Sequence, residues 1–321
     1  MKVLFIGGTG VISSACTAYA LSQGIDVFHL NRGQTHLRNI PDGVTTLKAD
    51  VRNERQVREA LGDHRFDAVV DWIAYTPEHV AQAIRLLAGR TGQYVLISSA
   101  SAYQKPPQKV PVTEETPLEN PYWEYARQKI ACERLLTLDG RIPYTIIRPS
   151  HTYDKTKVPL IGGFTTLQRI KRGEPVVVHG DGTSLWTLTH STDFAPGLVG
   201  LLGKQAAMGE AYHITSDEWL SWNQIYDLFG KALGKEPKIV HVPSGIIAQY
   251  NREIGDGLLG DKMHSMLFDN TKIRTVVPEF DPKIPFAEGV EEIVNYYAEG
   301  DHNEMENASV HQMMDAIVSR G

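Results

Sequence analysis

Residues 2–13 read KVLFIGGTGVIS, and this stretch decides the fold of the 321-residue chain. It opens with an unbroken apolar run, the pattern of a strand buried on both faces of a parallel sheet. A glycine turn follows and leads into a helical pattern. Gly7 permits the tight turn, and Gly10 lets the backbone approach a pyrophosphate, which the first N–H groups of the helix would face. The turn therefore predicts dinucleotide binding by consecutive residues: Gly7, Gly8, Thr9, Gly10, Val11 and Ile12.

Strand-like and helix-like segments alternate along the first half of the chain. Strands are expected at residues 26–30, 47–49, 68–72, 94–97 and 144–147, and helices at 11–23, 53–61, 77–88 and 122–138. This alternation predicts an α/β fold with a Rossmann-type, doubly wound parallel sheet. Ligands of such sheets bind outside the carboxyl ends of the strands. The residues expected at those ends are Gly7, Asn31, Asp50, Ala74 and Ser99, and Val51 directly follows Asp50.

The pattern changes after Ser150. Glycine-containing turns separate shorter elements, which predicts a smaller C-terminal α/β lobe that covers the open end of the sheet. We therefore expect a dinucleotide-binding domain at residues 1–155 and a substrate-binding lobe at residues 156–321. Segments near residues 190–215 are expected to return to the first domain.

The composition is that of an ordinary globular protein, with 42% hydrophobic and 22% charged residues. A net charge of −6 and the lack of a lysine or arginine run argue against nucleic acid as the main partner. The two cysteines, Cys16 and Cys132, and the lack of a signal-like segment predict a reducing, cytoplasmic location. No stretch is apolar enough to predict a membrane span. The histidines lack the spacing of metal ligands, so no metal site is expected.

The residues after the second strand bear on the cofactor. A carboxylate at this place would hydrogen-bond the 2′-hydroxyl of the adenosine ribose and repel a 2′-phosphate. The chain instead has Asn31 and then Arg32, whose guanidinium can form a two-pronged contact with a phosphate. This favours NADP slightly over NAD, with a solvated loop arginine as the alternative. Asp50 could accept a hydrogen bond from the adenine amino group or cap the following helix.

Tyr125 and Lys129 are four residues apart on a predicted helix, so their side chains share one face. An ammonium group near a phenol favours the phenolate and lowers its pKa from about 10, so such a tyrosine can transfer protons near neutral pH. The spacing alone is not specific, because Tyr153 and Lys157 repeat it. The second pair lies in a helix-poor segment, and the first pair is therefore preferred.

These landmarks together resemble the extended short-chain dehydrogenase/reductase family, and within it the NAD-dependent epimerase/dehydratase branch. The resemblance covers nearly the whole chain. The matching segments are GGTGVI at residues 7–12, DV at 50–51, SSASAY at 98–103, YARQK at 125–129, RP at 148–149, HGDGT at 179–183 and HSTD at 190–193. The resemblance implies a Rossmann-type fold that binds NAD(P), with Tyr125, Lys129 and Pro149 among the cofactor contacts.

Carried over position by position, the resemblance makes Tyr125 the catalytic acid/base and Lys129 the residue that modulates it and holds the nicotinamide ribose. Ser99 takes the place of the catalytic Ser/Thr and would hydrogen-bond the reacting oxygen. Ser101 is a substrate-binding candidate, with loop packing as the alternative. Sugar dehydratases of the family carry an Asp-Glu pair after the catalytic Ser/Thr, where this chain has Ala100 and Ser101. A dehydratase is therefore disfavoured, while an epimerase and a dehydrogenase or reductase stay open.

The resemblance also implies a small-molecule substrate, namely a sugar and by family precedent a nucleotide sugar. Two positions depart from the family pattern. Trp186 stands where members that bind a nucleotide diphosphate often have arginine, and His151 stands where they often have asparagine. Trp186 could stack on a base or sugar, and His151 could donate to a substrate oxygen, with core and loop packing as the alternatives.

A competing hypothesis is a non-catalytic cofactor-binding or RNA-associated regulatory protein of the same fold. The turn of Asn31, Arg32 and Gly33 resembles that of relatives that associate with RNA. The Ser99, Tyr125 and Lys129 set favours catalysis, because a protein that only binds does not need all three. Fold analogy further predicts a homodimer.

Overall fold

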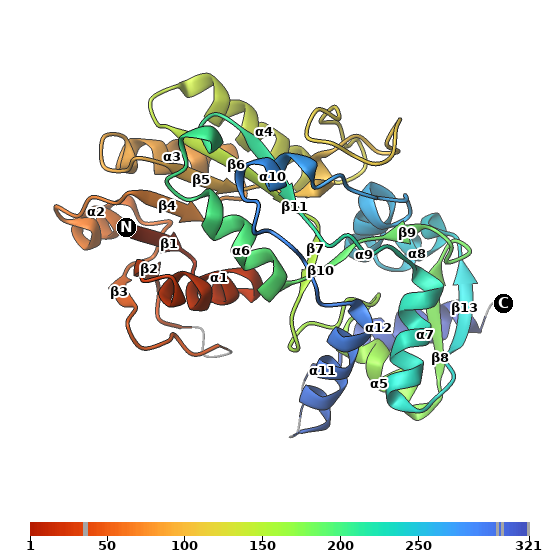
Figure 1. Cartoon of the computed structure of the whole chain (residues 1–321). Coiled ribbons are helices and arrows are strands. Elements are labelled where there is room, and N and C mark those ends of the chain that lie inside the picture. The colour runs from red at the N-terminus through yellow and green to blue at the C-terminus, as the bar shows by residue number, and fades with distance from the viewer. Residues whose placement is uncertain (35–37, 300–301, 303–304, 320–321) are drawn as a thin grey trace.

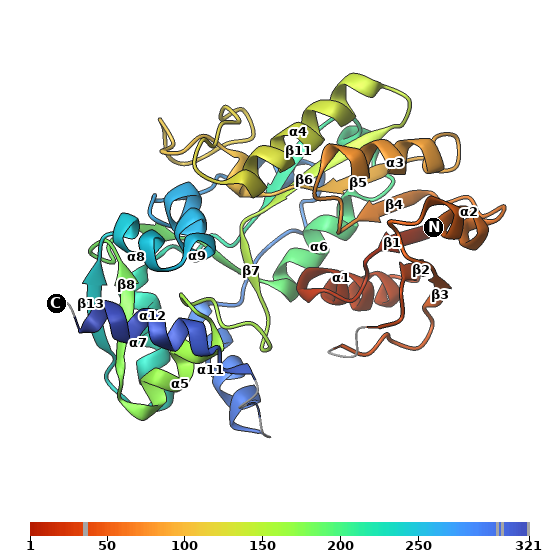
Figure 2. The same ribbon diagram turned by 180° about the vertical axis from the view of Figure 1, so that it is seen from behind.

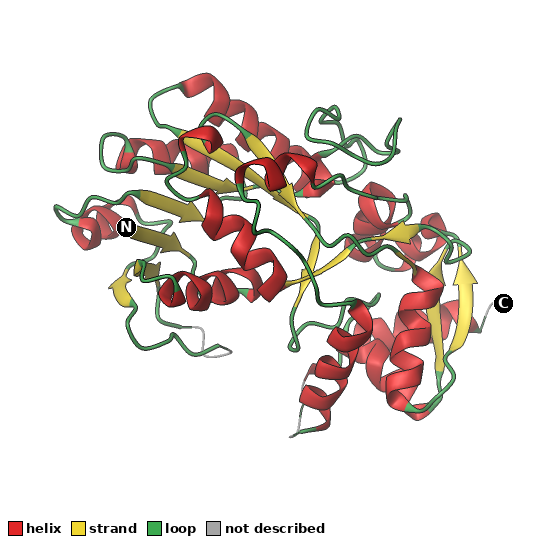
Figure 3. Cartoon of the chain, viewed as in Figure 1, coloured by secondary structure: helices red, strands yellow, loops and turns green. Residues whose placement is uncertain are grey.

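A seven-stranded, all-parallel sheet forms the larger part of the molecule in the computed structural model, which describes residues 1–34, 38–299, 302 and 305–319 (Figures 1 and 3). Its strand order is β11-β6-β5-β4-β1-β2-β3. The bounds are β1 Lys2–Ile6, β2 Asp26–Asn31, β3 Thr45–Lys48, β4 Ala68–Asp71, β5 Tyr94–Ile97, β6 Tyr144–Pro149 and β11 Ala211–Ile214. The predicted doubly wound parallel sheet is confirmed.

The strand order reverses between β1 and β4. From β1 the chain builds outward through β2 and β3, and it then returns to the other side of β1 with β4. The helices that connect strands on the two sides cover opposite faces, so a crevice opens at the carboxyl ends of β1 and β4. The glycine turn follows β1 directly, and the segment from Trp72 to Tyr75 follows β4. The fold thus brings these two segments to one place.

Helices cover both faces of the sheet. Helices α1 (Val11–Ser22) and α6 (Ser191–Leu201) pack together on one face, and α3 (Pro77–Leu87) and α4 (Glu124–Asp139) pack on the other, with α2 (Glu54–Leu61) beside α3 (Figures 1 and 2). Local signals set several ends: Asn53 caps α2, Pro77 begins α3, and Gly140 ends α4 in the left-handed conformation. The predicted boundaries agree within about two residues, as is usual for helix ends.

The predicted third strand, residues 47–49, is misplaced, because β3 spans Thr45–Lys48. This strand lies at the edge of the sheet and is largely exposed, so it lacks the continuous apolar run that marks β1. The predicted return of residues near 190–215 corresponds to α6 and to β11, which pairs with β6. The division of the chain at residue 155 stays a prediction.

A second group of elements packs beside the carboxyl ends of the sheet (Figures 1 and 2). Its strands form small pairs: β7 (His151–Tyr153) with β10 (Leu188–His190), β8 (Pro175–His179) with β13 (Lys238–Val242), and β9 (Leu185–Trp186) with β12 (Leu220–Ser221). Its helices are α5 (Phe164–Arg172), α7 (Trp222–Leu233), α8 (Ser244–Tyr250), α9 (Arg252–Gly257), the π-helix η3 (Leu258–Lys262), α11 (Phe286–Ala298) and α12 (Ala308–Val318). The short helix α10 (Thr271–Val276) instead packs against β11 and α6 at the sheet (Figure 1). The short 3₁₀-helices are η1 (Ala100–Ala102) and η2 (Gln205–Ala207). Within the described ranges, no helix has the length and apolarity to cross a membrane.

A buried ion pair joins α4 to β6. The guanidinium of Arg148 approaches Glu133 to 2.7 Å and also donates to the carboxylate through Nε, and both side chains are buried. The Ser98 hydroxyl donates to the same carboxylate. These contacts hold the helix that carries Tyr125 against the strand end that carries Ser99.

We expect Glu133→Ala to lower the free energy of unfolding by about 3–5 kcal/mol, because it leaves the buried Arg148 charge without its carboxylate partner. Chemical denaturation followed by circular dichroism measures this loss. Glu124→Ala is the matched control, since Glu124 lies on the same helix and pairs with Arg127 at the surface; it should change stability little. Equal losses in the two variants would contradict a structural role for the buried pair.

Candidate active site

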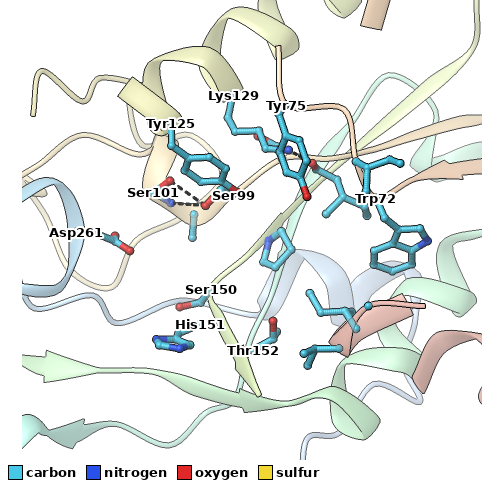
Figure 4. Close-up of a pocket in the computed structure, with 18 of the residues that line it drawn as sticks. Trp72, Tyr75, Ser99, Ser101, Tyr125, Lys129, Ser150, His151, Thr152 and Asp261 are labelled. Carbon is cyan, nitrogen blue, oxygen red and sulfur yellow. Dashed lines mark hydrogen bonds between the residues drawn. The ribbon is translucent and has the colours of Figure 1, made fainter. Parts of the chain in front are cut away.

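A cavity of about 480 Å³ opens at the carboxyl ends of β1, β4 and β5. Its walls come from the glycine turn, the segments after β4 and β5, the start of α4, and β7 and η3 of the second group (Figure 4). The predicted residues that line it are Gly7, Gly10, Val11, Ile12, Ser99, Ser101, Tyr125, Lys129, Pro149 and His151. Residues that are far apart in sequence thus share one hollow.

Ser99, Tyr125 and Lys129 lie together in this cavity (Figure 4). Tyr125 and Ser99 both line it, the Ser99 hydroxyl favours the phenolate form of Tyr125, and Ser99 Oγ lies 2.8 Å from Ser101 Oγ. Lys129 Nζ donates to the carbonyl oxygens of Ala74 and Ile97, both at 2.7 Å. An ammonium group has three N–H donors. These two bonds leave one donor on a residue that lines the cavity.

The predicted lowering of the Tyr125 pKa is not found. Burial raises the pKa of Tyr125 to about 12, and the hydrogen bond from Ser99 opposes this only in part. Lys129 Nζ lies 5.7 Å from the centroid of the Tyr125 ring, and its nearest oxygen partners are carbonyl groups. Burial also lowers the pKa of Lys129 to about 8. Desolvation therefore outweighs the attraction between the phenolate and the ammonium.

The glycine turn is closed by a side chain that sequence reasoning did not assign. Ser13 Oγ accepts a hydrogen bond from the Gly10 amide at 2.8 Å and donates to the Gly7 carbonyl at 3.1 Å. Gly7 has a φ of 85°, which favours glycine. Gly8 is required for packing, because a Cβ there would lie 2.5 Å from the ring of His29. Gly8 was predicted to bind the cofactor, but it lies outside the lining of both cavities at this turn.

A second cavity, of about 800 Å³, adjoins the first and shares Gly7, Gly10, Ile73 and Tyr75 with it. The predicted cofactor residues that line it are Thr9, Asn31, Arg32, Asp50 and Val51. Arg32 is exposed and has no carboxylate partner among the residues that the structure describes. Asp50 accepts a hydrogen bond from the Arg52 amide, whereas the helix cap is Asn53, so the capping alternative for Asp50 is wrong.

The residues of this paired cavity fit an extended dinucleotide. A Cβ built on Gly10 would meet only Ser13 Oγ within 4 Å, so the turn leaves open space at the start of α1. Asn31 Nδ2 is a buried donor with no hydrogen-bond partner, while Asn31 Oδ1 accepts from the Gly33 amide. The pyrophosphate would face the turn that the two cavities share, the adenosine would lie beside Asn31 and Asp50, and the nicotinamide would lie beside Tyr125.

The two departures from the family pattern lie in different places. His151 lines the cavity, and the Trp186 indole donates to its Nδ1 at 3.4 Å. Trp186 is 2% exposed, packs against Trp222 and is not part of the lining. Its predicted contact with the substrate is therefore not supported, and core packing accounts for it.

Several lining residues have no counterpart among the predicted ones: Trp72, Ile73, Tyr75, Trp123, Ser150, Thr152, Lys157, Asp261 and Lys262. Tyr75 is 45% exposed and lies where the cavities meet, with its ring 4.8 Å from Lys129 Nζ. Tyr75 directly follows Ala74, which was predicted at a strand end, so the sequence could have indicated that Tyr75 lies at the site. Lys157 was noticed for its spacing from Tyr153 and set aside, because its segment lacks a helical pattern. The sequence offers no signal for Asp261 and Lys262, because they reach the cavity from η3 of the second group.

A parallel sheet with this strand order, and with a glycine turn at the point where the order reverses, defines a Rossmann-type dinucleotide-binding protein. The chain belongs to the NAD dependent epimerase/dehydratase family, whose sequence model matches residues 3–215. The family resemblance is confirmed.

Individual relatives support the same assignment. The 2'-dehydrokanamycin reductase of Streptomyces kanamyceticus is 26% identical over 290 residues, which cover 88% of this chain and 81% of that protein. The chloroplast stem-loop binding protein of 41 kDa b from Arabidopsis thaliana is 27% identical over 254 residues, which cover 75% of this chain and 65% of that protein. The structure of UDP-glucose 4-epimerase from Thermus thermophilus in complex with NAD has a TM-score of 0.74 at 20% identity and covers 94% of this chain and 100% of that chain.

We expect Gly10→Val to prevent NAD binding and to leave the free energy of unfolding nearly unchanged, because the new side chain would occupy the open space at the turn. Calorimetric titration with NAD and chemical denaturation measure the two effects. Gly245→Val on α8 is the control, since a Cβ at Gly245 also meets open space. A binding curve that matches the wild type would count against the assignment of the turn to the pyrophosphate.

Proposed function

We propose that this protein is an NAD(P)-dependent oxidoreductase or epimerase that acts on a hydroxyl or ketone of a sugar, with Tyr125 as acid/base. The observation that carries this proposal is that Ser99, Tyr125 and Lys129 line one cavity, which shares its glycine turn with the adenosine-side cavity. Membership of an NAD-dependent family agrees with it.

The cofactor, when bound, accepts or supplies a hydride. Ser99 Oγ donates a hydrogen bond to the reacting oxygen of the substrate and orients it. Tyr125 removes the hydroxyl proton during oxidation and returns a proton to the oxygen during reduction. Lys129 holds the nicotinamide ribose through its remaining N–H donor and stabilises the phenolate. The neighbouring Ser101 hydroxyl, at 2.8 Å, keeps Ser99 Oγ in place.

A dehydratase of the family's usual design remains disfavoured. Such an enzyme needs carboxylates that remove a proton and expel water, and positions 100 and 101 carry alanine and serine. Among the described residues that line the cavity, Asp261 is the one carboxylate, and it pairs with Lys105 at 3.2 Å. An epimerase must let the ketone intermediate rotate in the cavity, so that it is reduced on its other face. A reductase needs no such rotation.

The proposed substrate is a nucleotide sugar. Its support is the family and the names of relatives, which include UDP-glucose 4-epimerases and a dTDP-glucose 4,6-dehydratase. The reductase relative from Streptomyces kanamyceticus supports a sugar-like substrate without a nucleotide. The cofactor content of the purified protein separates the reactions, because tightly retained NAD without net turnover fits an epimerase and exchangeable cofactor fits a reductase.

We expect Tyr125→Phe to lower hydride transfer by about 10²–10⁴-fold, because the variant has no proton to exchange with the substrate. Cofactor affinity should change little. Nicotinamide absorbance measured with a panel of UDP- and dTDP-sugars gives the rate, and NAD titration gives the affinity. Tyr122→Phe serves as the control, since Tyr122 is exposed just before α4. Equal rates for the Tyr125 variant and the wild type would refute the acid/base role.

We further propose a slight preference for NADP over NAD through Arg32. The support is the guanidinium of Arg32, which has no carboxylate partner among the described residues of the adenosine-side cavity, and the absence of a carboxylate at Asn31.

Arg32→Ala should weaken NADPH binding by about 10–100-fold, the worth of a charge-assisted pair, and NADH binding much less. Fluorescence titration of the reduced cofactors measures both affinities. Arg55→Ala, at an exposed position on α2, is the control. Comparable losses for NADPH and NADH would remove the case for a 2′-phosphate contact.

The second candidate function is that of a cofactor-binding or RNA-associated protein without catalysis. It is favoured by the similarity to the chloroplast stem-loop binding protein and opposed by the net charge of −6. RNA binding that needs no cofactor and falls linearly on a log–log plot against salt would support it. The cytoplasmic location and the homodimer stay predictions.

A further inference from the structure

Positive charge collects in the candidate active site of a protein that is acidic as a whole. The chain carries a net charge of −6. Among the described residues that line the first cavity, however, three are lysines, Lys129, Lys157 and Lys262, and one is a carboxylate, Asp261. His151 lines the same cavity, and burial lowers its pKa well below the usual value, so it stays neutral.

Two of these charged groups already have partners in the cavity wall. The Asp261 carboxylate lies 3.2 Å from Lys105 Nζ, and the Lys105 side chain is 0% exposed. Lys129 Nζ donates to the carbonyl oxygens of Ala74 and Ile97. Asp261, the only carboxylate of the described lining, is thus already paired with a buried lysine of the cavity wall.

Lys157 and Lys262 have no such partner. No carboxylate or carbonyl oxygen lies within hydrogen-bond distance of either ammonium group in the described part of the chain. Lys262 Nζ instead lies over two indole rings, 5.6 Å from the Trp123 centroid and 5.8 Å from that of Trp186. Contacts of this kind stabilise a cation but leave its N–H donors free for another acceptor.

The two lysines also repel each other. Enclosure by protein lowers the pKa of Lys157, the charges of Lys262 and Arg38 lower it further, and Asp154 opposes them. Enclosure likewise lowers the pKa of Lys262, which the charge of Asp261 opposes. Lys157 is exposed and Lys262 is half-buried, so solvent screens this repulsion only in part, and an anion bound between them would relieve the rest. Solvent reaches Lys157 through the cavity, so such an anion has access to it.

We propose that Lys157 and Lys262 form an anion subsite that binds a phosphate or carboxylate group of the substrate. This inference rests on the proposed function, because it names a chemical feature of the molecule that reacts at Tyr125. Both lysines line the first cavity and neither lines the adenosine-side cavity. Trp186, over which Lys262 lies, belongs to β9 of the second group. The subsite is therefore on the substrate side and separate from the glycine turn.

The test measures anion binding to the NAD-saturated protein, with inorganic pyrophosphate and D-glucuronate as separate probes and D-glucose as the neutral control. Quenching of tryptophan fluorescence reports binding, because Trp123 lies beside Lys262. We expect saturable binding of at least one anion and none of glucose. Lys157→Gln and Lys262→Met should each raise its Kd about tenfold, as expected for loss of one charge-assisted hydrogen bond. The anion whose Kd rises more in these variants shows whether the subsite recognises a phosphate or a carboxylate group of the substrate.

Lys155→Gln is the matched control, since Lys155 is exposed, lies two residues before Lys157 and is absent from the cavity lining. Lys262→Arg should retain anion binding, because arginine keeps the positive charge that Lys262→Met removes. If Lys262 served only for packing, keeping the charge would not matter. No saturable binding of either anion to the wild type, or unchanged affinity in both variants, would overturn the inference. An equal loss of NAD affinity would also overturn it, because the lysines would then serve the cofactor. Binding is measured without turnover, so the inference and the acid/base role of Tyr125 can fail separately.

Discussion

The ammonium group of Lys129 is the contact on which the geometry of the candidate active site depends. It lies 2.7 Å from both Ala74 O and Ile97 O, at the ends of β4 and β5, and the residue is 1% exposed. Burying an ammonium group is unfavourable, and buried carbonyl groups at strand ends also need donors. The two requirements offset each other here. Because α4 is thereby fixed to two adjacent strands, Tyr125, one helical turn earlier, is held beside Ser99.

The same burial sets the electrostatics of the site. Desolvation moves the pKa values of Tyr125 and Lys129 to about 12 and about 8, and so favours a neutral phenol beside a lysine that is charged at neutral pH. A proton-transfer group is most effective when its pKa lies near the working pH. Under the proposed function, the pKa of Tyr125 must therefore fall when substrate and cofactor fill the cavity. The unused N–H donor of Lys129 and the hydroxyl of Ser99 are the groups that can lower it.

The sequence predicts the parts of the structure that repeat a local pattern. The apolar run before Gly7 and the alternating segments indicated the sheet, and the helical spacing indicated the common face of Tyr125 and Lys129. Exposed β3 was misplaced, because an edge strand has a weak pattern. Asp261 and Lys262 were missed, since a π-helix leaves no periodic signal, and Lys157 was set aside because its segment is not helical. The pKa of Tyr125 could not be predicted either, because it depends on how much protein surrounds the ring.

Ion pairs between the sheet part of the chain and the second group of elements explain why positive charge predominates in the first cavity. Arg38 donates to both oxygens of Asp154, with side chains 14% and 17% exposed, and Lys105 pairs with Asp261. Each pair joins segments more than a hundred residues apart, and Arg38 and Asp261 line the two cavities. These carboxylates therefore hold the walls together, while Lys262 faces the first cavity without a carboxylate partner among the described residues. Trp186 fits this division, because a buried indole supports the ammonium of Lys262 without neutralising it. Under the proposed anion subsite, Lys157 and Lys262 would therefore keep their N–H donors for a phosphate or carboxylate of the substrate.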